Sequence, residues 1–421
     1  MNYKEALSYI DSVRWYGSRP GLSRIEALLE KLGRPQDDLR FIHIAGTNGK
    51  GSCAAMTASI LRAAGYKTGL FTSPYLFRFN ERMQINGEPI EDEALAEIVT
   101  ELQPFADALE DHPTEFELMT AAALRWYQRE RCDVVVLEVG LGGRCDATNV
   151  IACPEAAVVM NIGLDHTAVL GDTVAAIAAE KAGIIKPGGD AVLYAQSAEA
   201  EAVVRARCEA VGARLRVSDP AQLHAEFDSL EGQVFTYRGV PYALPLLGEH
   251  QLRNAAVVLE LVELLREKGW KLEQDAVEHG LYAVSWPARF ELVRDEPPFI
   301  VDGGHNPQCA EAVAAALRRY FPHTRRVLLL GVLADKDYPR ILDILAPEAD
   351  AFVCVTPASE RALPAAQLGA ALEKFGKPVT VCADIPEGVA AASEQAGADG
   401  MACAVGSLYM AGAVRAEFGL F

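Results

Sequence analysis

The sequence predicts an α/β protein in which a mostly parallel sheet domain is followed by a smaller α/β domain. Short apolar runs alternate with segments of helical periodicity along most of the 421 residues, and such alternation is typical of parallel strands covered by helices on both faces. The chain is longer than a single hydrophobic core usually extends. Trp286-Pro287-Ala288-Arg289-Phe290 has the composition of a hinge, so we expect domains at 1–286 and 287–421.

The first strand of the chain leads into a phosphate loop. An apolar run at residues 41–45 passes through Gly46-Thr47-Asn48-Gly49-Lys50-Gly51-Ser52 into a helical segment. Glycines let the loop N–H groups point inward, and the helix N-terminus adds its positive dipole end. Lys50 would meet the β- and γ-phosphates of a nucleotide, and Ser52 would offer a hydroxyl to Mg²⁺. An isoleucine replaces the first glycine of the common motif, and a glycine separates Lys50 from Ser52; a turn without ligand is the alternative.

The remaining elements are predicted from apolar periodicity and from turn residues. In the first domain, helices are expected at 22–32, 52–64, 115–128, 173–182 and 254–265, with Thr114 capping the third, and further strands at 68–72, 132–138 and 156–161. A hairpin is expected near 234–239. Beyond the hinge, five short strands with helices between them predict a Rossmann-like domain; they lie at 299–302, 327–330, 352–355, 379–381 and 402–405.

Three polar residues of the first domain stand at or near the ends of predicted elements. Glu138 closes an apolar strand, His166 follows the next strand, and Lys181 lies near a helix end. A buried glutamate is unfavourable unless a cation meets it, whereas His166 and Lys181 taken singly are typical of a loop histidine and a solvated lysine. Ligands of open α/β sheets bind at the carboxyl ends of strands, so Glu138 and His166 become candidate metal ligands beside a phosphate loop.

Two polar, glycine-containing loops follow strands of the second domain. They are Asp302-Gly303-Gly304-His305-Asn306-Pro307 and Gly331-Val332-Leu333-Ala334-Asp335-Lys336-Asp337. Each by itself has the composition of a turn. Because this domain has no phosphate loop of its own, we expect it to be a lobe that closes over the nucleotide held by the first domain.

Charge and cysteine usage exclude several classes of protein. The net charge of −19 argues against a nucleic-acid or anionic-membrane surface, which would need a basic face. Nine scattered cysteines without a C-x-x-C pair are typical of a reduced protein. Neither a signal-like N-terminus nor an apolar run of membrane-spanning length occurs. We therefore expect a cytoplasmic protein, and we expect it to be a monomer.

Together these motifs match a known family over nearly the whole chain. The sequence resembles folylpolyglutamate synthase and dihydrofolate synthase, within the Mur ligase superfamily of ATP-dependent amide-forming enzymes. The family usually has alanine where Gly304 stands, which is a small-for-small change. Besides the phosphate loop and the loop at 302–307, the resemblance rests on Ser73-Pro74, Asn80-Glu81-Arg82, Glu138-Val139-Gly140-Leu141-Gly142-Gly143-Arg144, Asp146-Ala147-Thr148-Asn149, Asp165-His166-Thr167, Glu180-Lys181-Ala182-Gly183-Ile184 and Asp335-Lys336-Asp337.

The resemblance also implies roles for individual residues. Lys181 corresponds to the family's carbamylated lysine, in which a cation becomes a carboxylate-like group near the metals. Two Mg²⁺ ions would be coordinated by Ser73, Glu138 and His166. ATP would be held by Gly49, Lys50, Gly51 and Ser52, with further contacts from Asn254, Arg289 and Asp302. The pterin end would lie near Thr114, Glu115, Phe116, Glu117, Cys145, Asp146 and Ala147, and the incoming glutamate near Asp302 and His305. The catalytic set implied is Lys50, His166, Lys181, Asp302 and His305.

The implied activity is the ATP-dependent addition of L-glutamate to the γ-carboxylate of a folate through an acyl phosphate. The alternative within the family is the joining of glutamate to dihydropteroate, alone or as a second activity. A regulatory P-loop ATPase is a more distant alternative. It is disfavoured because none of the eight asparagines is followed by lysine, so no N-K-x-D guanine motif occurs.

Overall fold

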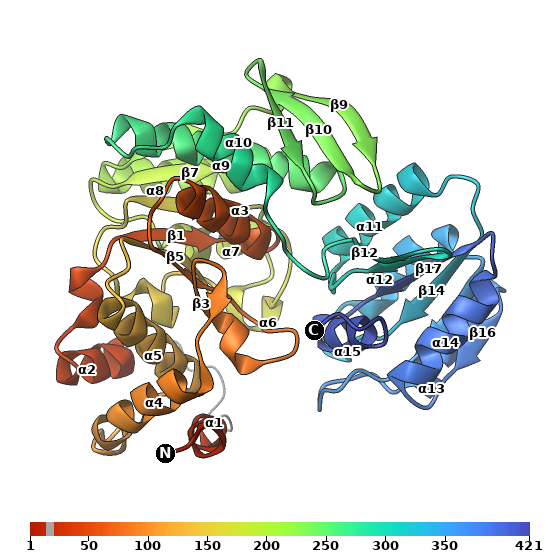
Figure 1. Ribbon diagram of the computed structural model, residues 1–421, viewed down its shortest axis with the longest axis horizontal. Helices are drawn as coiled ribbons and strands as arrows, with labels where there is room; N and C mark the ends of the chain where they lie inside the picture. Colours follow the sequence, from red (N-terminus) through yellow and green to blue (C-terminus); the bar gives the residue numbers. More distant parts are fainter. Residues whose placement is uncertain (14–20) are drawn as a thin grey trace. The chain divides into compact units, whose positions relative to one another are not determined.

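The structure, a computed structural model, describes residues 1–13 and 21–421 (Figure 1). The chain forms two compact units. The first contains Met1–Leu223, Tyr237–Tyr242 and Arg253–Val284, and the second contains His224–Thr236, Ala243–Leu252 and Ser285–Phe421. In the described residues, no helix is long and apolar enough to cross a membrane.

The first unit is built on an eight-stranded sheet with the order β4-β3-β2-β5-β1-β6-β7-β8. The strands from β2 to β8 along this order pair in parallel, whereas β3 and β4 add an antiparallel edge. The mostly parallel sheet predicted for this part of the chain is therefore confirmed. The strands are β1 (Phe41–Ala45), β2 (Thr68–Phe71), β3 (Met83–Ile85), β4 (Glu88–Pro89), β5 (Val134–Glu138), β6 (Ala156–Val159), β7 (Asp190–Leu193) and β8 (Arg214–Val217).

Strand β1 lies at the centre of the sheet, between β5 and β6. All five residues of β1 and all five of β5 are buried, which explains why both read as apolar runs rather than as alternating patterns. Parallel pairing places Ile44 beside Glu138. The carboxyl ends of β1, β5 and β6 therefore meet at one edge of the sheet.

Helices surround this sheet (Figure 1). Gly280 of α10 comes so close to α3 that an added Cβ would lie 2.4 Å from Ile60 Cα, so only glycine permits this helix crossing. The helices assigned wholly to the unit are α1 (Tyr3–Ser12), α2 (Ser23–Lys31), α3 (Lys50–Ala63), α4 (Asp92–Asp107), α5 (Glu115–Arg129), α6 (Thr167–Leu170), α7 (Val174–Ala182), α8 (Ala198–Val211) and α10 (Gln274–Tyr282).

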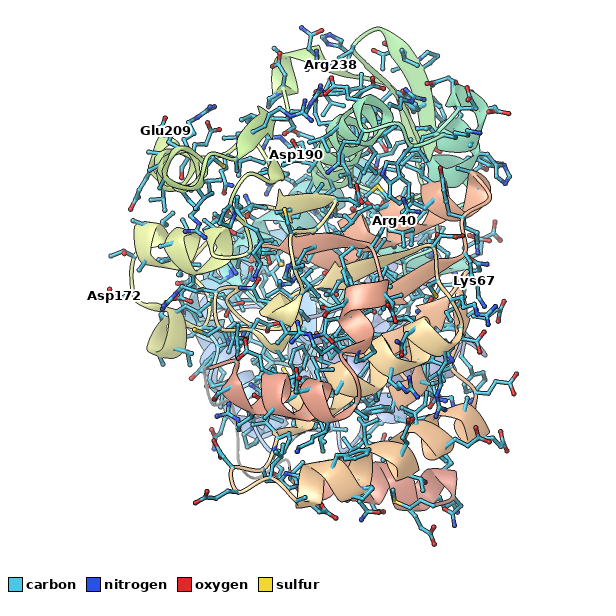
Figure 2. The ribbon with its side chains drawn as sticks, turned by 90° about the vertical axis from the view of Figure 1, so that its left-hand side faces the viewer. Arg40, Lys67, Asp172, Asp190, Glu209 and Arg238 are labelled. Atoms are coloured by element: carbon cyan, nitrogen blue, oxygen red, sulfur yellow. The ribbon has the colours of Figure 1, made fainter. Side chains whose placement is uncertain are left out.

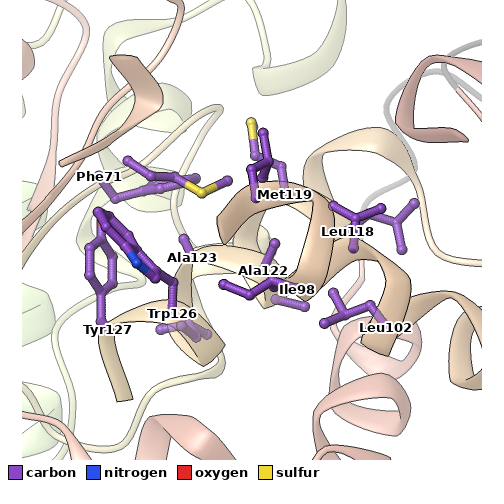
Figure 3. Close-up of a cluster of buried hydrophobic side chains, with 14 of the residues drawn as sticks. Phe71, Ile98, Leu102, Leu118, Met119, Ala122, Ala123, Trp126 and Tyr127 are labelled. Carbon is purple, nitrogen blue, oxygen red and sulfur yellow. The ribbon is translucent and has the colours of Figure 1, made fainter. Parts of the chain in front are cut away.

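Helices α4 and α5 enclose a hydrophobic cluster against the sheet (Figure 3). Leu118 and Ala122 of α5 share a face at helical spacing, and they lie beside Ile98 and Leu102 of α4. The start of α5 is a capping box, in which the Thr114 side chain accepts the Glu117 N–H and the Glu117 carboxylate accepts the Thr114 N–H. The predicted Thr114 cap is thus confirmed.

The hairpin predicted near 234–239 is present as β10 and β11, and β9 extends it to a three-stranded sheet of order β11-β10-β9. Its residues are divided between the two units, although the sequence placed all of them in the first domain. Within the second unit, the Asp228 carboxylate of β9 accepts hydrogen bonds from Arg319 and Tyr320. The strands are β9 (Leu223–Ser229), β10 (Gly232–Tyr237) and β11 (Val240–Leu244), and helix α9 (Glu249–Glu267) follows them.

The second unit contains a six-stranded sheet of order β12-β13-β17-β14-β15-β16. Five strands were predicted, and all five occur in parallel pairing. The additional strand β12 pairs antiparallel with β13, and it was missed because its residues are only half-buried and lack an apolar run. The strands are β12 (Glu291–Asp295), β13 (Pro298–Val301), β14 (Arg326–Leu330), β15 (Ala351–Cys354), β16 (Val379–Val381) and β17 (Met401–Val405). The helices are α11 (Pro307–Tyr320), α12 (Tyr338–Leu345), α13 (Ala365–Leu372), α14 (Ile385–Ala396) and α15 (Leu408–Ala416).

A buried carboxylate on α9 supports the strands of the first unit. Glu260 is 2% exposed, and its Oε1 accepts the Tyr237 hydroxyl at 2.7 Å and Arg238 Nη2 at 2.6 Å. Its Oε2 lies 3.3 Å from Arg216 Nη1 of β8. Figure 2 shows Arg238 at the outside of the chain, so the carboxylate is buried beneath partly exposed guanidinium groups.

We predict that Glu260→Ala lowers the free energy of unfolding by about 2 kcal/mol, because it leaves the Tyr237 hydroxyl and two arginines without this acceptor. Urea unfolding followed by circular dichroism measures the change. The matched control is Glu263→Ala on the same helix, where an ion pair with the partly exposed Arg266 is lost and the cost should stay below about 0.5 kcal/mol. Equal effects of the two substitutions would contradict the role assigned to Glu260.

Candidate active site

The loop between β1 and α3 has a backbone that only glycine can supply at two positions. Gly49 has φ +83°, and an added Cβ would lie 2.7 Å from the Asn254 side-chain oxygen. Gly46 has φ +158°, and its Cβ would lie 2.6 Å from Met160 Cβ. The loop therefore packs tightly against α9 on one side and the end of β6 on the other. This places the predicted ATP contact Asn254 directly beside the phosphate loop.

The start of α3 has the properties of an anion site. Helix α3 begins at Lys50, and within the described residues no side chain caps it, so the first-turn N–H groups and the helix dipole remain directed at the loop. The Thr47 N–H donates to Asn161 O at 2.7 Å, and the Thr47 hydroxyl lies 3.0 Å from Gly163 O. Lys50 Nζ lies 3.4 Å from Thr47 O. The N–H groups at the start of α3, together with Lys50, fit a bound phosphate group, while Thr47 anchors the loop to the residues after β6.

Glu138 ends β5 as a buried carboxylate, 4% exposed, and its Oε2 accepts the Ser73 N–H at 3.2 Å. The structure therefore brings together two of the three predicted metal ligands. Oxygen donors suit Mg²⁺, which commonly takes one or two protein ligands and completes its shell with phosphate oxygens and water. Among the described residues, no group of three His, Cys, Asp or Glu side chains could hold a metal ion by itself, so Mg²⁺ coordination by Ser73 and Glu138 stays a prediction.

His166 lies at the start of the short helix α6, with a left-handed backbone at φ +50°. Its side chain is 42% exposed, and its Nε2 lies 3.9 Å from Asp165 Oδ1. Imidazole is also a possible metal ligand. The assignment of His166 as the third metal ligand stays a prediction.

Lys181 is buried, 4% exposed, and donates a hydrogen bond from Nζ to Gly46 O at 2.9 Å. Burial and the charge of Lys50 lower the pKa of Lys181 to about 7, while Asp165 and Asp146 act in the opposite direction. The solvated lysine that the sequence allowed as an alternative is thus excluded. Lys181 instead touches the phosphate loop.

The loop after β5 is clamped against α7, the helix that carries Lys181. An added Cβ at Gly143 would lie 2.7 Å from Glu180 O, and one at Gly183 would lie 2.4 Å from Arg144 Cβ. Arg144 also pairs with the Glu180 carboxylate at 2.6 Å. These close contacts hold the loop against the helix and so fix the position of Lys181 relative to the residues that follow Gly143.

Asp146 is the hub of this loop. Its Oδ2 accepts the Leu141 N–H at 2.8 Å, and its Oδ1 accepts the Thr148 N–H at 3.0 Å and the Thr148 hydroxyl at 2.5 Å. Burial raises the pKa of Asp146, and these donors oppose that shift because they stabilise the carboxylate. Cys145 and Ala147, predicted like Asp146 to lie near the pterin, are held in place with it.

The other residues predicted to lie near the pterin are at the start of α5. Thr114 and Glu117 form the capping box, and Glu117 also accepts Arg24 Nε at 3.0 Å in a buried ion pair. Phe116 lies against Gly140, where an added Cβ would be 2.4 Å from its ring. Arg24 is a functional candidate that the sequence did not reveal, because it occupies an ordinary amphipathic helix. Glu115 follows the cap at the first position of α5.

A second group of predicted residues lies in the second unit. Asp302 accepts the Phe290 N–H at 2.8 Å and the Gly304 N–H at 2.6 Å, and His305 Nδ1 lies 3.1 Å from Gly303 O. Arg289 Nη1 lies 3.2 Å from where a Gly303 Cβ would be. His250 was missed by the sequence analysis. Burial lowers the pKa of His250. The Asp302 carboxylate opposes this shift, and the positive charge of Arg289 adds to it.

Comparisons with known proteins identify both halves of the chain. Residues 44–262 match the Mur ligase middle domain, and residues 288–408 match the Mur ligase glutamate ligase domain. Folylpolyglutamate synthase of Lacticaseibacillus casei is 38% identical over 433 residues, covering 99% of this chain and 98% of the relative. A dihydrofolate synthase/folylpolyglutamate synthase of Bacillus subtilis is also 38% identical, covering 83% of this chain and 84% of the relative.

A solved structure agrees in fold as well as in sequence. Mycobacterium tuberculosis folylpolyglutamate synthase, described as complexed with ADP and AMPPCP, covers 100% of both chains at 35% identity with a TM-score of 0.90. The resemblance noted in the motifs is therefore confirmed by the whole chain. The protein belongs to the folylpolyglutamate synthase and dihydrofolate synthase family of Mur ligases.

Proposed function

We propose that this protein is an ATP-dependent ligase that adds L-glutamate to the γ-carboxylate of a folate. The observation that carries the proposal is the meeting of three elements in the first unit. The phosphate loop, the buried Lys181 and the loop held by Asp146 contact one another directly or through a single helix. A nucleotide site next to an ordered second substrate loop is what an ATP-dependent ligase needs, because proximity of the reactants supplies much of the rate enhancement.

The chemistry follows from the weakness of a carboxylate as an acyl donor. Transfer of the γ-phosphoryl group of ATP to the folate carboxylate gives an acyl phosphate, the glutamate amine attacks its carbonyl carbon, and phosphate leaves. Lys50 and the N–H groups at the start of α3 stabilise the charge on the transferring group. Mg²⁺ held by Ser73, Glu138 and His166 would supply further charge stabilisation at the phosphates.

The proposal also assigns a substrate to each of the other predicted residues. Asn254, Arg289 and Asp302 contact ATP, Asp302 and His305 border the glutamate, and Phe116 with the Asp146 loop meets the pterin. We propose an ATP-binding domain at 1–286 and a C-terminal glutamate-ligase domain at 287–421. The enzyme is proposed to act as a monomer in the cytoplasm, where reducing conditions suit its nine free cysteines.

The first test separates the activities that the family name combines. Phosphate release is measured with ATP and glutamate in the presence of tetrahydrofolate, dihydropteroate, both or neither. Turnover that requires glutamate and tetrahydrofolate supports the proposal, and turnover with dihydropteroate adds the second activity carried in the name of the Bacillus relative. Phosphate release that is independent of glutamate and pteridine would overturn it in favour of a regulatory ATPase.

The phosphate loop gives a second prediction. Lys50→Met should reduce ligation at least about 100-fold, because a positioned charge on the transferring phosphoryl group is lost, while unfolding free energy changes by less than about 1 kcal/mol. Lys67→Met is the matched control, since Lys67 pairs with Glu130 at a partly exposed site. Turnover of the Lys50 variant within threefold of the Lys67 variant would refute the assignment.

A third prediction concerns carbamylation, which we propose for Lys181. Carbon dioxide reacts with the neutral amine. At pH 7.5 a lysine with an ordinary pKa is neutral in about one molecule per thousand, whereas the lowered pKa of Lys181, about 7, makes the neutral amine far more abundant. Carbamylation should therefore fall as pH drops below 7.

Nuclear magnetic resonance with ¹³C-bicarbonate measures the carbamate directly. The wild-type protein should show a carbamate carbonyl signal at pH 7.5 that is weaker at pH 6 and absent in Lys181→Ala, and Lys67→Ala should retain it. A signal that survives Lys181→Ala would place the carbamate elsewhere, and no signal in the wild type would leave Lys181 an unmodified amine.

A further inference from the structure

A histidine is buried in the middle of the central strand. His43 of β1 is 0% exposed, and its neighbours Ile42 and Ile44 are equally buried. Its Nε2 lies 2.9 Å from the Thr148 hydroxyl oxygen, which in turn lies 2.5 Å from Asp146 Oδ1. The three side chains form a hydrogen-bonded chain from the core of the sheet to the loop that follows β5.

The direction of the protons in this chain is fixed by chemistry. Thr148 has one hydroxyl proton, and it donates that proton to Asp146 because an ionised carboxylate only accepts. The Thr148 oxygen must then accept from His43, so the imidazole carries its proton on Nε2. Burial and the charge of Lys186 lower the pKa of His43 to about 3, which keeps the ring neutral. Each bond polarises the next in such a chain.

Packing alone does not account for this histidine. His43 Nδ1 is buried and has no hydrogen-bond partner among the residues that the structure describes, and an unpaired buried polar atom is unfavourable. An apolar side chain would fill the strand position without that penalty. The favourable contribution of His43 therefore lies at Nε2, in the bond to Thr148.

Asp146 connects the His43–Thr148 pair to the backbone of the loop. The same carboxylate accepts the N–H groups of Leu141 and Thr148, so it ties the beginning of the loop to its end. Phe116, the pterin candidate on α5, lies against Gly140 at the beginning of this loop. The orientation of the Asp146 carboxylate thus sets the shape of the surface proposed to meet the pterin.

We infer that His43 is a positioning residue for the pteridine substrate: through Thr148 it orients the Asp146 carboxylate from the strand that also carries the phosphate loop. The inference rests on the proposed function for the identity of that substrate. His43 does not touch the substrate itself. Strand β1 ends two residues after His43, and the phosphate loop begins at Gly46. The same strand therefore supports the phosphate loop directly and the loop after β5 through His43.

The kinetic test compares variants that break the chain with variants that keep it. His43→Leu and Thr148→Val preserve approximate volume but remove the bonds, and each should raise the KM for the pteridine substrate about tenfold while leaving the KM for ATP within twofold. His43→Gln keeps a donor at the Nε2 position and Thr148→Ser keeps the hydroxyl, so both should stay within threefold of wild type. The His43→Leu/Thr148→Val double variant should be no worse than either single variant, because the residues act in series.

A second measurement does not depend on activity or on the identity of the substrate. Backbone hydrogen exchange should become at least threefold faster in residues 140–148 of His43→Leu, while strand β1 keeps its protection. If His43→Leu fails to fold, Thr148→Val carries the same test at a position outside the sheet. Should the wild type lack pteridine-dependent turnover, the exchange result still decides whether His43 holds the loop at residues 140–148, so the two failures are distinguishable.

Three outcomes would overturn the inference. The first is a KM for ATP that rises as much as the KM for the pteridine, which indicates a general loss of structure. The second is a His43→Gln variant as impaired as His43→Leu. The third is unchanged exchange in residues 140–148 of His43→Leu, or of Thr148→Val where His43→Leu does not fold.

Discussion

The hydrogen bond from Lys181 to the carbonyl of Gly46 is the interaction on which the first unit's site depends. It joins α7 to the phosphate loop and requires a lysine to be buried, which is unfavourable for its charged form. The arrangement persists because α7 has little freedom. Gly143 and Gly183 allow backbone approaches that any side chain would block, and the Arg144 to Glu180 ion pair adds to them. Close packing at Gly143 and Gly183 thus keeps Lys181 buried although burial disfavours its charged form.

The first half of this site could be predicted from the sequence because it depends on local order along the chain. Strand, glycine loop and helix follow one another within residues 41–64, and parallel strands bring their carboxyl ends to a common edge regardless of what lies between them. Glu138 was therefore recognisable as a strand-end carboxylate, and the structure places Ser73 beside it. The roles assigned to the metals and to carbamylation came from family resemblance, which no local pattern replaces.

The residues that sequence reasoning missed act through partners far away in the chain. Arg24 pairs with Glu117, 93 residues later, and His43 reaches Thr148 across 105 residues. A histidine inside an apolar strand carries no periodic signal of its bond, and an arginine in an amphipathic helix resembles a solvated one. Strand β12 was missed for a related reason, since a half-buried edge strand has no continuous apolar run.

Electrostatics connects these observations to the proposed chemistry. The protein carries a net charge of −19, yet its proposed substrates are anions, so local cations must meet them. Lys50 and Lys181 are close enough for the charge of Lys50 to lower the pKa of Lys181. The same charge favours both steps of the proposed carbamylation, because it increases the neutral amine that reacts and attracts the anionic carbamate that results. Asp146 and Asp165 oppose that gain of negative charge, and cations bound beside Glu138 would offset their effect. The phosphate-loop lysine therefore acts on the proposed site twice, once on the phosphoryl group and once on the state of Lys181.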